Sequence, residues 1–196
     1  MKTFHELQEG VYDPNILKAF FLAGGPGSGK SYVVKRTTGG LGMKVINSDI
    51  AFEKKLKDAG LSLDIRELDP EVRDEIRGQA KRITAKQKAN YLNGRLGLII
   101  DGTGKDYDKI ATQATQLKQL GYDVHMIFVN TSLDTALERN AKRDRKLRDS
   151  MVIKSWNDVQ SNLGKFSQYF RRNFIVVDNN DSEEDIMGPV YKQVMS

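Results

Sequence analysis

The sequence predicts an α/β fold in which helices cover both faces of a parallel sheet. Five short apolar segments alternate with longer segments whose apolar residues recur at helical spacing. Strands joined by such crossover helices pair in parallel, and a parallel sheet is normally buried on both faces. The 196 residues are enough for one domain with a buried core, and no linker or internal repeat divides them.

The five expected strands are followed or separated by amphipathic segments. In chain order, the strands are residues 17–23, 43–48, 96–101, 124–130 and 173–178. The clearest helical stripes are Val72-Ile76-Ala80-Ile83, Ile110-Ala114-Leu117, Leu133-Leu137-Ala141 and Val152-Trp156-Val159-Leu163. Asp69-Pro70 marks the start of the first helix, and Thr131-x-x-Asp134 resembles a capping box for the third. Gly121 is placed to end the second helix.

Composition limits the classes of function. The chain is 39% hydrophobic and 29% charged, as soluble globular proteins are, and it contains no cysteine. Disulfides and thiolate metal sites are therefore excluded, and His5 and His125 are too few for a histidine metal centre. No apolar run approaches the roughly 18 residues of a membrane helix, and we expect neither a secretory signal nor a membrane partner. The net charge of +5 favours anionic partners such as nucleotides, nucleic acids or phosphorylated sugars.

Residues 24–31, with the sequence GGPGSGKS, match the pattern G-x-x-x-x-G-K-[ST] between an expected strand and an expected helix. The glycines let successive backbone N–H groups face one point, where the helix N-terminus adds partial positive charge. Lys30 is placed to reach the β- and γ-phosphates, and the Ser31 hydroxyl to ligate Mg²⁺. The residues expected to bind ATP here are Gly24, Gly25, Pro26, Gly27, Ser28, Gly29, Lys30, Ser31 and Tyr32.

Aspartates follow the next two expected strands. Asp49 is placed either to accept a proton from an attacking hydroxyl or simply to cap the following helix, and the sequence leaves both readings open. Asp101 occupies a Walker B-like position suited to Mg²⁺. Residues 101–104 also imitate a GTPase switch, but no Asn-Lys-x-Asp follows, and Gly102 stands where a motor ATPase usually has a second acid. Both absences favour a kinase.

Residues 137–150 are rich in arginine and lysine. We expect at least one of Arg139, Arg143 and Arg145 to contact phosphate, because phosphoryl transfer depends on positioning and on neutralising charge. A solvated basic helix face is the alternative. Four other conspicuous residues have a structural interpretation: Trp156, Phe166 and Phe170 as packing, and His125 as an ordinary strand residue.

"AGGPGSGKS", "VINSD", "LIIDGTG" and the arginine-rich segment occur in the order found in small P-loop kinases. Over about residues 16–180 the chain resembles the clan that holds zeta toxins and the kinase part of polynucleotide 5′-hydroxyl kinases. The resemblance implies a three-layer P-loop NTPase fold with a central five-stranded parallel sheet. It implies ATP and Mg²⁺ as cofactors, Asp49 as general base, and Arg139 with Arg143 or Arg145 as lid arginines.

The same resemblance gives further residues a role. Thr103 and Lys105, with Asp49 and Asp101, match positions that handle substrate, and Asn179 and Asn180 match a loop that borders the adenine. One departure is Phe52, which stands where many members have an arginine that holds a substrate phosphate. Another is a long charged insertion at about residues 60–93, which we expect to be helical and to bind substrate.

The sequence thus predicts an N-terminal extension, residues 1–15, and a kinase domain, residues 16–196. The expected reaction transfers the γ-phosphoryl of ATP to a hydroxyl of a nucleotide, a nucleic-acid end or a nucleotide-sugar. The alternative is a nucleotide-dependent binding module or a nucleic-acid-stimulated ATPase with no phosphorylated acceptor. Neither reading fixes the oligomeric state.

The first ten residues resemble the capsid-targeting peptides of internal proteins in large tailed phages, and the rest of the chain resembles a phage-encoded kinase. Leu7-Gln8-Glu9 would be the processing site. We therefore expect a cytoplasmic enzyme, which would act in the host cytoplasm if it is phage-encoded and could then be packaged in the virion. The alternative is an amphipathic turn in which Phe4 and Leu7 pack on the domain.

Overall fold

The structure is a computed structural model that describes residues 16–37, 42–64, 68–143 and 146–180. Within these ranges it has five parallel strands in the order β2-β3-β1-β4-β5. The strands are β1 Lys18–Ala23, β2 Lys44–Ile46, β3 Leu98–Asp101, β4 Asp123–Asn130 and β5 Phe174–Asp178. The predicted three-layer α/β fold with a five-stranded parallel sheet is confirmed.

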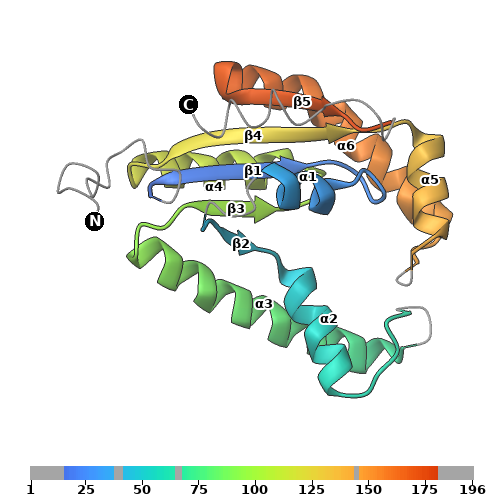
Figure 1. The fold of residues 1–196 in the computed structure, drawn as a ribbon. Coiled ribbons are helices and arrows are strands. Elements are labelled where there is room, and N and C mark those ends of the chain that lie inside the picture. Colours follow the sequence, from blue (N-terminus) through green and yellow to red (C-terminus); the bar gives the residue numbers. More distant parts are fainter. Residues whose placement is uncertain (1–15, 38–41, 65–67, 144–145, 181–196) are drawn as a thin grey trace, which may run out of the picture.

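The helices lie on both sides of this sheet, as Figure 1 shows. They are α1 Lys30–Thr37, α2 Ser48–Asp58, α3 Pro70–Asn93, α4 Tyr107–Gln119, α5 Leu133–Ala141 and α6 Asp149–Phe170, with the short 3₁₀ helix η2 Arg171–Asn173 before β5. In the part of the chain that is described, none of these helices combines the length and the apolar character needed to cross a bilayer.

The central strand β1 explains how the layers are held together. All six of its residues are buried, and the five from Ala19 to Ala23 alternate between two separate cores. Phe21 packs with residues of α4 and α6 on one face, whereas Phe20 and Leu22 pack with Val33 of α1 on the other. A strand with apolar side chains on both faces fits only in the middle of a covered sheet.

Helices α2 and α3 form a unit beside the edge strand β2, seen below the sheet in Figure 1. Phe52 and Leu56 of α2 pack against Ile76 and Ala80 of α3 in a small core of their own. Because this unit begins directly after β2, it lies next to the edge where the parallel strands end. That edge is where ligands bind in open α/β sheets.

Three expectations differ from the structure: the end of a strand, the cap of a helix and the buried stripe of another helix. The strand expected over residues 43–48 ends at Ile46, because Asn47 is the N-cap of α2. The cap of α5 is Ser132 and not Thr131, which is buried, because the Ser132 hydroxyl accepts from the Thr135 N–H at 3.1 Å. On α3 the buried stripe continues with Thr84, whereas Val72 and Ile83 are exposed.

The structure also confirms the interpretation of three conspicuous side chains. Phe166 and Phe170 of α6 are buried in the core that α6 forms with α4 and the sheet. His125 lies within β4, stacks on Phe20 and bonds to Asp123. The N-terminal extension with Leu7-Gln8-Glu9 lies outside the described residues.

Candidate active site

The loop between β1 and α1 is forced into a tight path by its glycines. Gly27 has a φ of +84°, and a Cβ there would lie 2.4 Å from the carbonyl oxygen of Ala136 on α5. Gly29 has a φ of +85°, and a Cβ there would lie 2.2 Å from Nδ2 of Asn179. Only glycine accepts both the left-handed backbone and these approaches. The loop is therefore seated against α5 and against the end of β5.

Two side chains outside the motif hold this loop in place. Asn179, which is buried, donates from Nδ2 to the carbonyl of Ser28 at 2.7 Å, and its own N–H donates to the carbonyl of Asn130 at 2.9 Å. Trp156 of α6 packs against Gly25 and donates from Nε1 to the carbonyl of Thr131 at 2.9 Å. The sequence interpretation of Trp156 as a packing residue is confirmed, and the surface that it packs against is the loop.

Lys30, the first residue of α1, turns its ammonium back over the loop. Nζ donates to the carbonyls of Gly24 at 2.6 Å and Gly25 at 3.2 Å. Burial lowers the pKa of Lys30 to about 8, although the charges of Asp101 and Asp49 oppose that shift. A partly buried cation bonded to neutral carbonyls favours the binding of an anion, because the anion would stabilise its charge.

A second feature of the loop also fits a phosphate group. The hydroxyl of Ser28 is buried and has no hydrogen-bond partner within the described chain. Buried polar atoms are normally paired, so an unpaired one inside a binding loop marks a place where a ligand would supply the partner. Together with the N-terminus of α1, this loop has the donors and the positive charge that a phosphate requires.

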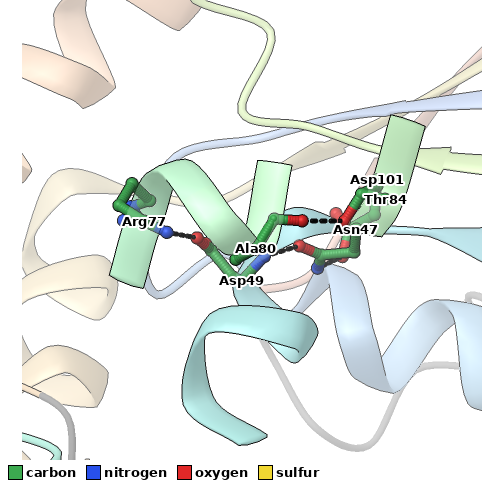
Figure 2. A network of polar contacts seen from close by, with 6 residues as sticks. All are labelled: Asn47, Asp49, Arg77, Ala80, Thr84 and Asp101. Atoms are coloured by element: carbon green, nitrogen blue, oxygen red, sulfur yellow. Dashed lines mark hydrogen bonds and ion pairs between the residues drawn. The ribbon is translucent and has the colours of Figure 1, made fainter. Parts of the chain in front are cut away.

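Asn47 links the two aspartates that the sequence singled out (Figure 2). Its Oδ1 accepts from the N–H of Asp49 at 2.7 Å, and its Nδ2 donates to Oδ2 of Asp101 at 2.6 Å. Asn47 therefore caps α2, and the alternative in which Asp49 is the cap is wrong. The carboxylate of Asp49 turns to α3, where Arg77 Nη1 donates to Oδ1 at 2.5 Å. Burial raises the pKa of Asp101, against the opposing effects of Lys30 and Asn47.

A cavity of about 630 Å³ lies at this edge of the sheet. It brings together seven of the residues that the sequence predicted for the site: Pro26, Lys30, Ser31, Asp49, Asp101, Thr103 and Arg143. Glu53 and Lys57 of α2 also line this cavity, and Lys142 and Leu147 line it from the segment between α5 and α6. Cations and carboxylates from four separate parts of the chain thus face one space.

Other predicted site residues lie elsewhere. Arg139 donates from Nη1 to the carbonyl of Asn179 at 2.8 Å and from Nη2 to the carbonyl of Asn180 at 3.5 Å, so its guanidinium faces the turn after β5. Lys105 is exposed after β3, where its carbonyl accepts from Asn162. Tyr32 is 49% exposed on α1. Arg145 lies outside the described residues.

Three residues of the site were missed from the sequence. Asn47 was hidden inside an expected strand, although an asparagine before Ser-Asp is a recognisable cap signal. Asn140 is buried and bridges the backbone of Leu147, donating to its carbonyl at 2.9 Å and accepting from its N–H at 3.2 Å. Arg77 follows Ile76 of the buried stripe on α3, and nothing in the sequence showed that it faces Asp49.

The residues at the cavity also fit a divalent cation. Ser31 offers a hydroxyl and Asp101 a carboxylate. No group of three or more His, Cys, Asp or Glu side chains suited to a metal occurs in the described ranges. Mg²⁺ is typically held by one or two carboxylates together with phosphate oxygens, so a single aspartate and a serine beside a phosphate loop suit it.

The parallel sheet of order β2-β3-β1-β4-β5, with a glycine-rich phosphate loop between β1 and α1, defines a P-loop NTPase fold. The family AAA_33, described as an AAA domain, matches residues 20–165. The chain belongs to this family. No curated protein matches it significantly.

Solved structures share the fold at low identity. The structure of AvrRxo1-ORF1:-ORF2 with ATP has a TM-score of 0.68 at 14% identity, over 87% of this chain and 57% of that one, so this chain spans less than two thirds of it. A gluconokinase from Sinorhizobium meliloti 1021 has a TM-score of 0.52 at 13% identity, over 92% and 91% of the two chains. A structure of the PezAT toxin-antitoxin system of Streptococcus pneumoniae has a TM-score of 0.57 at 15% identity, over 92% and 83%.

Proposed function

We propose that this protein is a P-loop kinase that transfers the γ-phosphoryl of ATP to a hydroxyl group with the help of Mg²⁺. The observation that carries the proposal is the cavity of about 630 Å³ in which the Lys30 loop and the Asp49 carboxylate meet. Lys30 belongs to an anion-binding loop on α1, whereas Asp49 belongs to a different helix and is linked through Asn47 to Asp101. The solved kinases that share the fold agree with this reading.

Each residue has a defined part in the proposed reaction. Lys30 and the loop amides hold the phosphates. Ser31 and Asp101 would hold Mg²⁺, which would supply further positive charge to the phosphates. Asp49 accepts the proton as the acceptor O–H bond breaks and a new O–P bond forms. The bond from Pγ to the β,γ-bridging oxygen breaks, and its electron pair leaves with ADP. Arg143 neutralises charge on the transferred group.

The acceptor that we propose is a hydroxyl of a nucleotide, a nucleic-acid end or a nucleotide-sugar. Support comes from the net charge of +5 and from the resemblance to the zeta toxin and polynucleotide kinase clan. The unit formed by α2 and α3, which includes the charged insertion, stands beside the cavity and is the proposed acceptor-binding part. We also propose a phage origin, from the resemblance of the whole chain to phage proteins, and virion packaging, from the resemblance of the first ten residues to capsid-targeting peptides. Mass spectrometry of purified virions that found no copy of this chain beginning at Gly10 would exclude the processing.

γ-labelled ATP offered with a panel of acceptors tests the function directly. The panel contains a DNA or RNA with a 5′-hydroxyl, nucleosides, nucleotides and UDP-N-acetyl sugars. We expect label on one acceptor class. Label appearing only in free phosphate, with a rate that rises on addition of nucleic acid, would instead support the ATPase class, for which the absence of a second acid at Gly102 is unfavourable.

A further inference from the structure

Arg77 of α3 contacts two residues of α2. Its Nη1 donates to Oδ1 of Asp49 at 2.5 Å, and its Cζ lies 4.2 Å from the centre of the Phe52 ring. Asp49 and Phe52 are three residues apart, so they share one face of α2. Figure 2 shows the Asp49 carboxylate turned toward Arg77, away from the Asn47 side of the network.

The ring contact gives this ion pair a defined orientation. Phe52 is fully buried with Leu56 and Ala80 in the core between α2 and α3, so the position of its ring is fixed. A planar guanidinium that stacks on a fixed ring and donates to a carboxylate is restricted in both plane and direction. The side chains of Arg77 and Asp49 are 30% and 48% exposed, and an ion pair that solvated contributes little to folding stability. Orientation is therefore its main effect.

Arg77 contacts Asp49 but is not among the described residues that line the cavity. Asp49 itself lines the cavity that Lys30 and Asp101 also line. The backbone of Asp49 is held at the same time by Asn47, whose amide also bonds to Asp101. The carboxylate of Asp49 is thus held by Arg77 of α3, while the backbone of Asp49 is joined through Asn47 to Asp101.

We propose that Arg77 is a positioning residue for phosphoryl transfer, which holds the Asp49 carboxylate at the point where the acceptor hydroxyl meets the γ-phosphoryl. This inference rests on the proposed function. Arg77 helps because the transition state of phosphoryl transfer is loose, so the reaction depends on accurate placement of the attacking oxygen.

The test compares three variants on the labelled acceptor. Arg77→Ala is expected to lower kcat about 10- to 100-fold while KM for ATP changes less than about twofold, because only the acceptor side is misplaced. Arg77→Lys keeps the charge but not the planar stack, so it should recover part of the loss. Arg73→Ala is the matched control, because Arg73 lies one turn earlier on α3 and pairs with Asp74 on its own helix. We expect it to match the wild type.

Coupling to Asp49 distinguishes positioning from a general loss of structure. In an Asp49→Asn background, Arg77→Ala should cost less than about threefold, because its target is already gone. A full 10- to 100-fold loss in that background, a wild-type kcat for Arg77→Ala, or a proportional rise in KM for ATP would overturn the proposal. If no acceptor is labelled, the proposed function fails. The wild type and the same variants are then compared by acceptor-free phosphate release, where water is the nucleophile and the same outcomes apply.

Discussion

At the residue scale, the phosphate loop places the Lys30 ammonium where its charged form is less stable than in water. The partly buried ammonium donates to the carbonyls of Gly24 and Gly25, and its pKa falls to about 8. Because the folded pKa lies below the ordinary value of 10.5, the charged form destabilises the free fold below about pH 8. That cost is relieved as the pH rises from about 8 toward 10.5. A bound phosphate relieves it at neutral pH.

ATP binding should take up a proton in this window. At about pH 8.5 much of the free protein carries a neutral Lys30, whereas a bound triphosphate favours the charged form. Affinity should therefore fall as the pH rises above about 8, by at most tenfold per unit. Titration calorimetry in two buffers with different ionisation enthalpies measures the uptake. Lys35→Met, an exposed lysine of the same helix, should leave it unchanged, and no uptake by the wild type would contradict the lowered pKa.

At the scale of elements, the site depends on the contact between the phosphate loop and α5. We expect Gly27→Ala to weaken ATP binding more than tenfold and to lower stability by more than the roughly 1–2 kcal/mol of left-handed strain alone, because its Cβ would overlap the backbone of α5. Gly60→Ala is the matched control, since Gly60 has a φ of +66° and nothing within 4 Å of a Cβ. Urea unfolding and ATP titration of both variants check this. Equal behaviour of the two would show that the contact does not matter.

Among the described residues, the buried amide of Asn140 holds Leu147, which lies between α5 and α6. Asn140→Ala leaves the N–H and carbonyl of Leu147 without their partner, a loss of about 1–3 kcal/mol that falls on this segment. Trypsin should then cleave within residues 142–148 several-fold faster than in the wild type. Asn157→Ala, at an exposed position of α6, should not change the rate. A cleavage rate unchanged by Asn140→Ala would mean that the amide does not close this segment.

The elements themselves were largely predictable, because apolar periodicity and the glycine motif are local in sequence. All five expected strands are present, and the phosphate loop lies between β1 and α1 as its motif required. The contacts between elements were not predictable. Arg77 and Asp49 are separated by 28 positions, and only the packing of α3 on α2 brings them together. Arg139 and Arg143 share one predicted helix face, yet Arg139 bonds to the carbonyls after β5 and Arg143 lines the cavity.

For the whole molecule, the arrangement separates two tasks. The sheet, α1 and α5 build the phosphate loop, whereas the unit of α2 and α3 supplies Asp49 and its partner Arg77. Asn47, at the junction of β2 and α2, is the link between them through its bonds to Asp49 and Asp101. Movement of α2 and α3 relative to the sheet would therefore change the position of the proposed base without changing the phosphate loop.

Single-turnover transfer from γ-labelled ATP to the acceptor, compared among wild type, Lys30→Ala and Asp49→Asn, tests this account most directly. The wild type should label the acceptor, and Lys30→Ala should neither bind ATP measurably nor transfer. Asp49→Asn should bind ATP like the wild type and transfer about 10²- to 10⁴-fold more slowly, because it keeps the loop and loses the base. Transfer by Asp49→Asn at the wild-type rate would contradict the assignment of the base and, with it, the proposed joining of the two halves of the site.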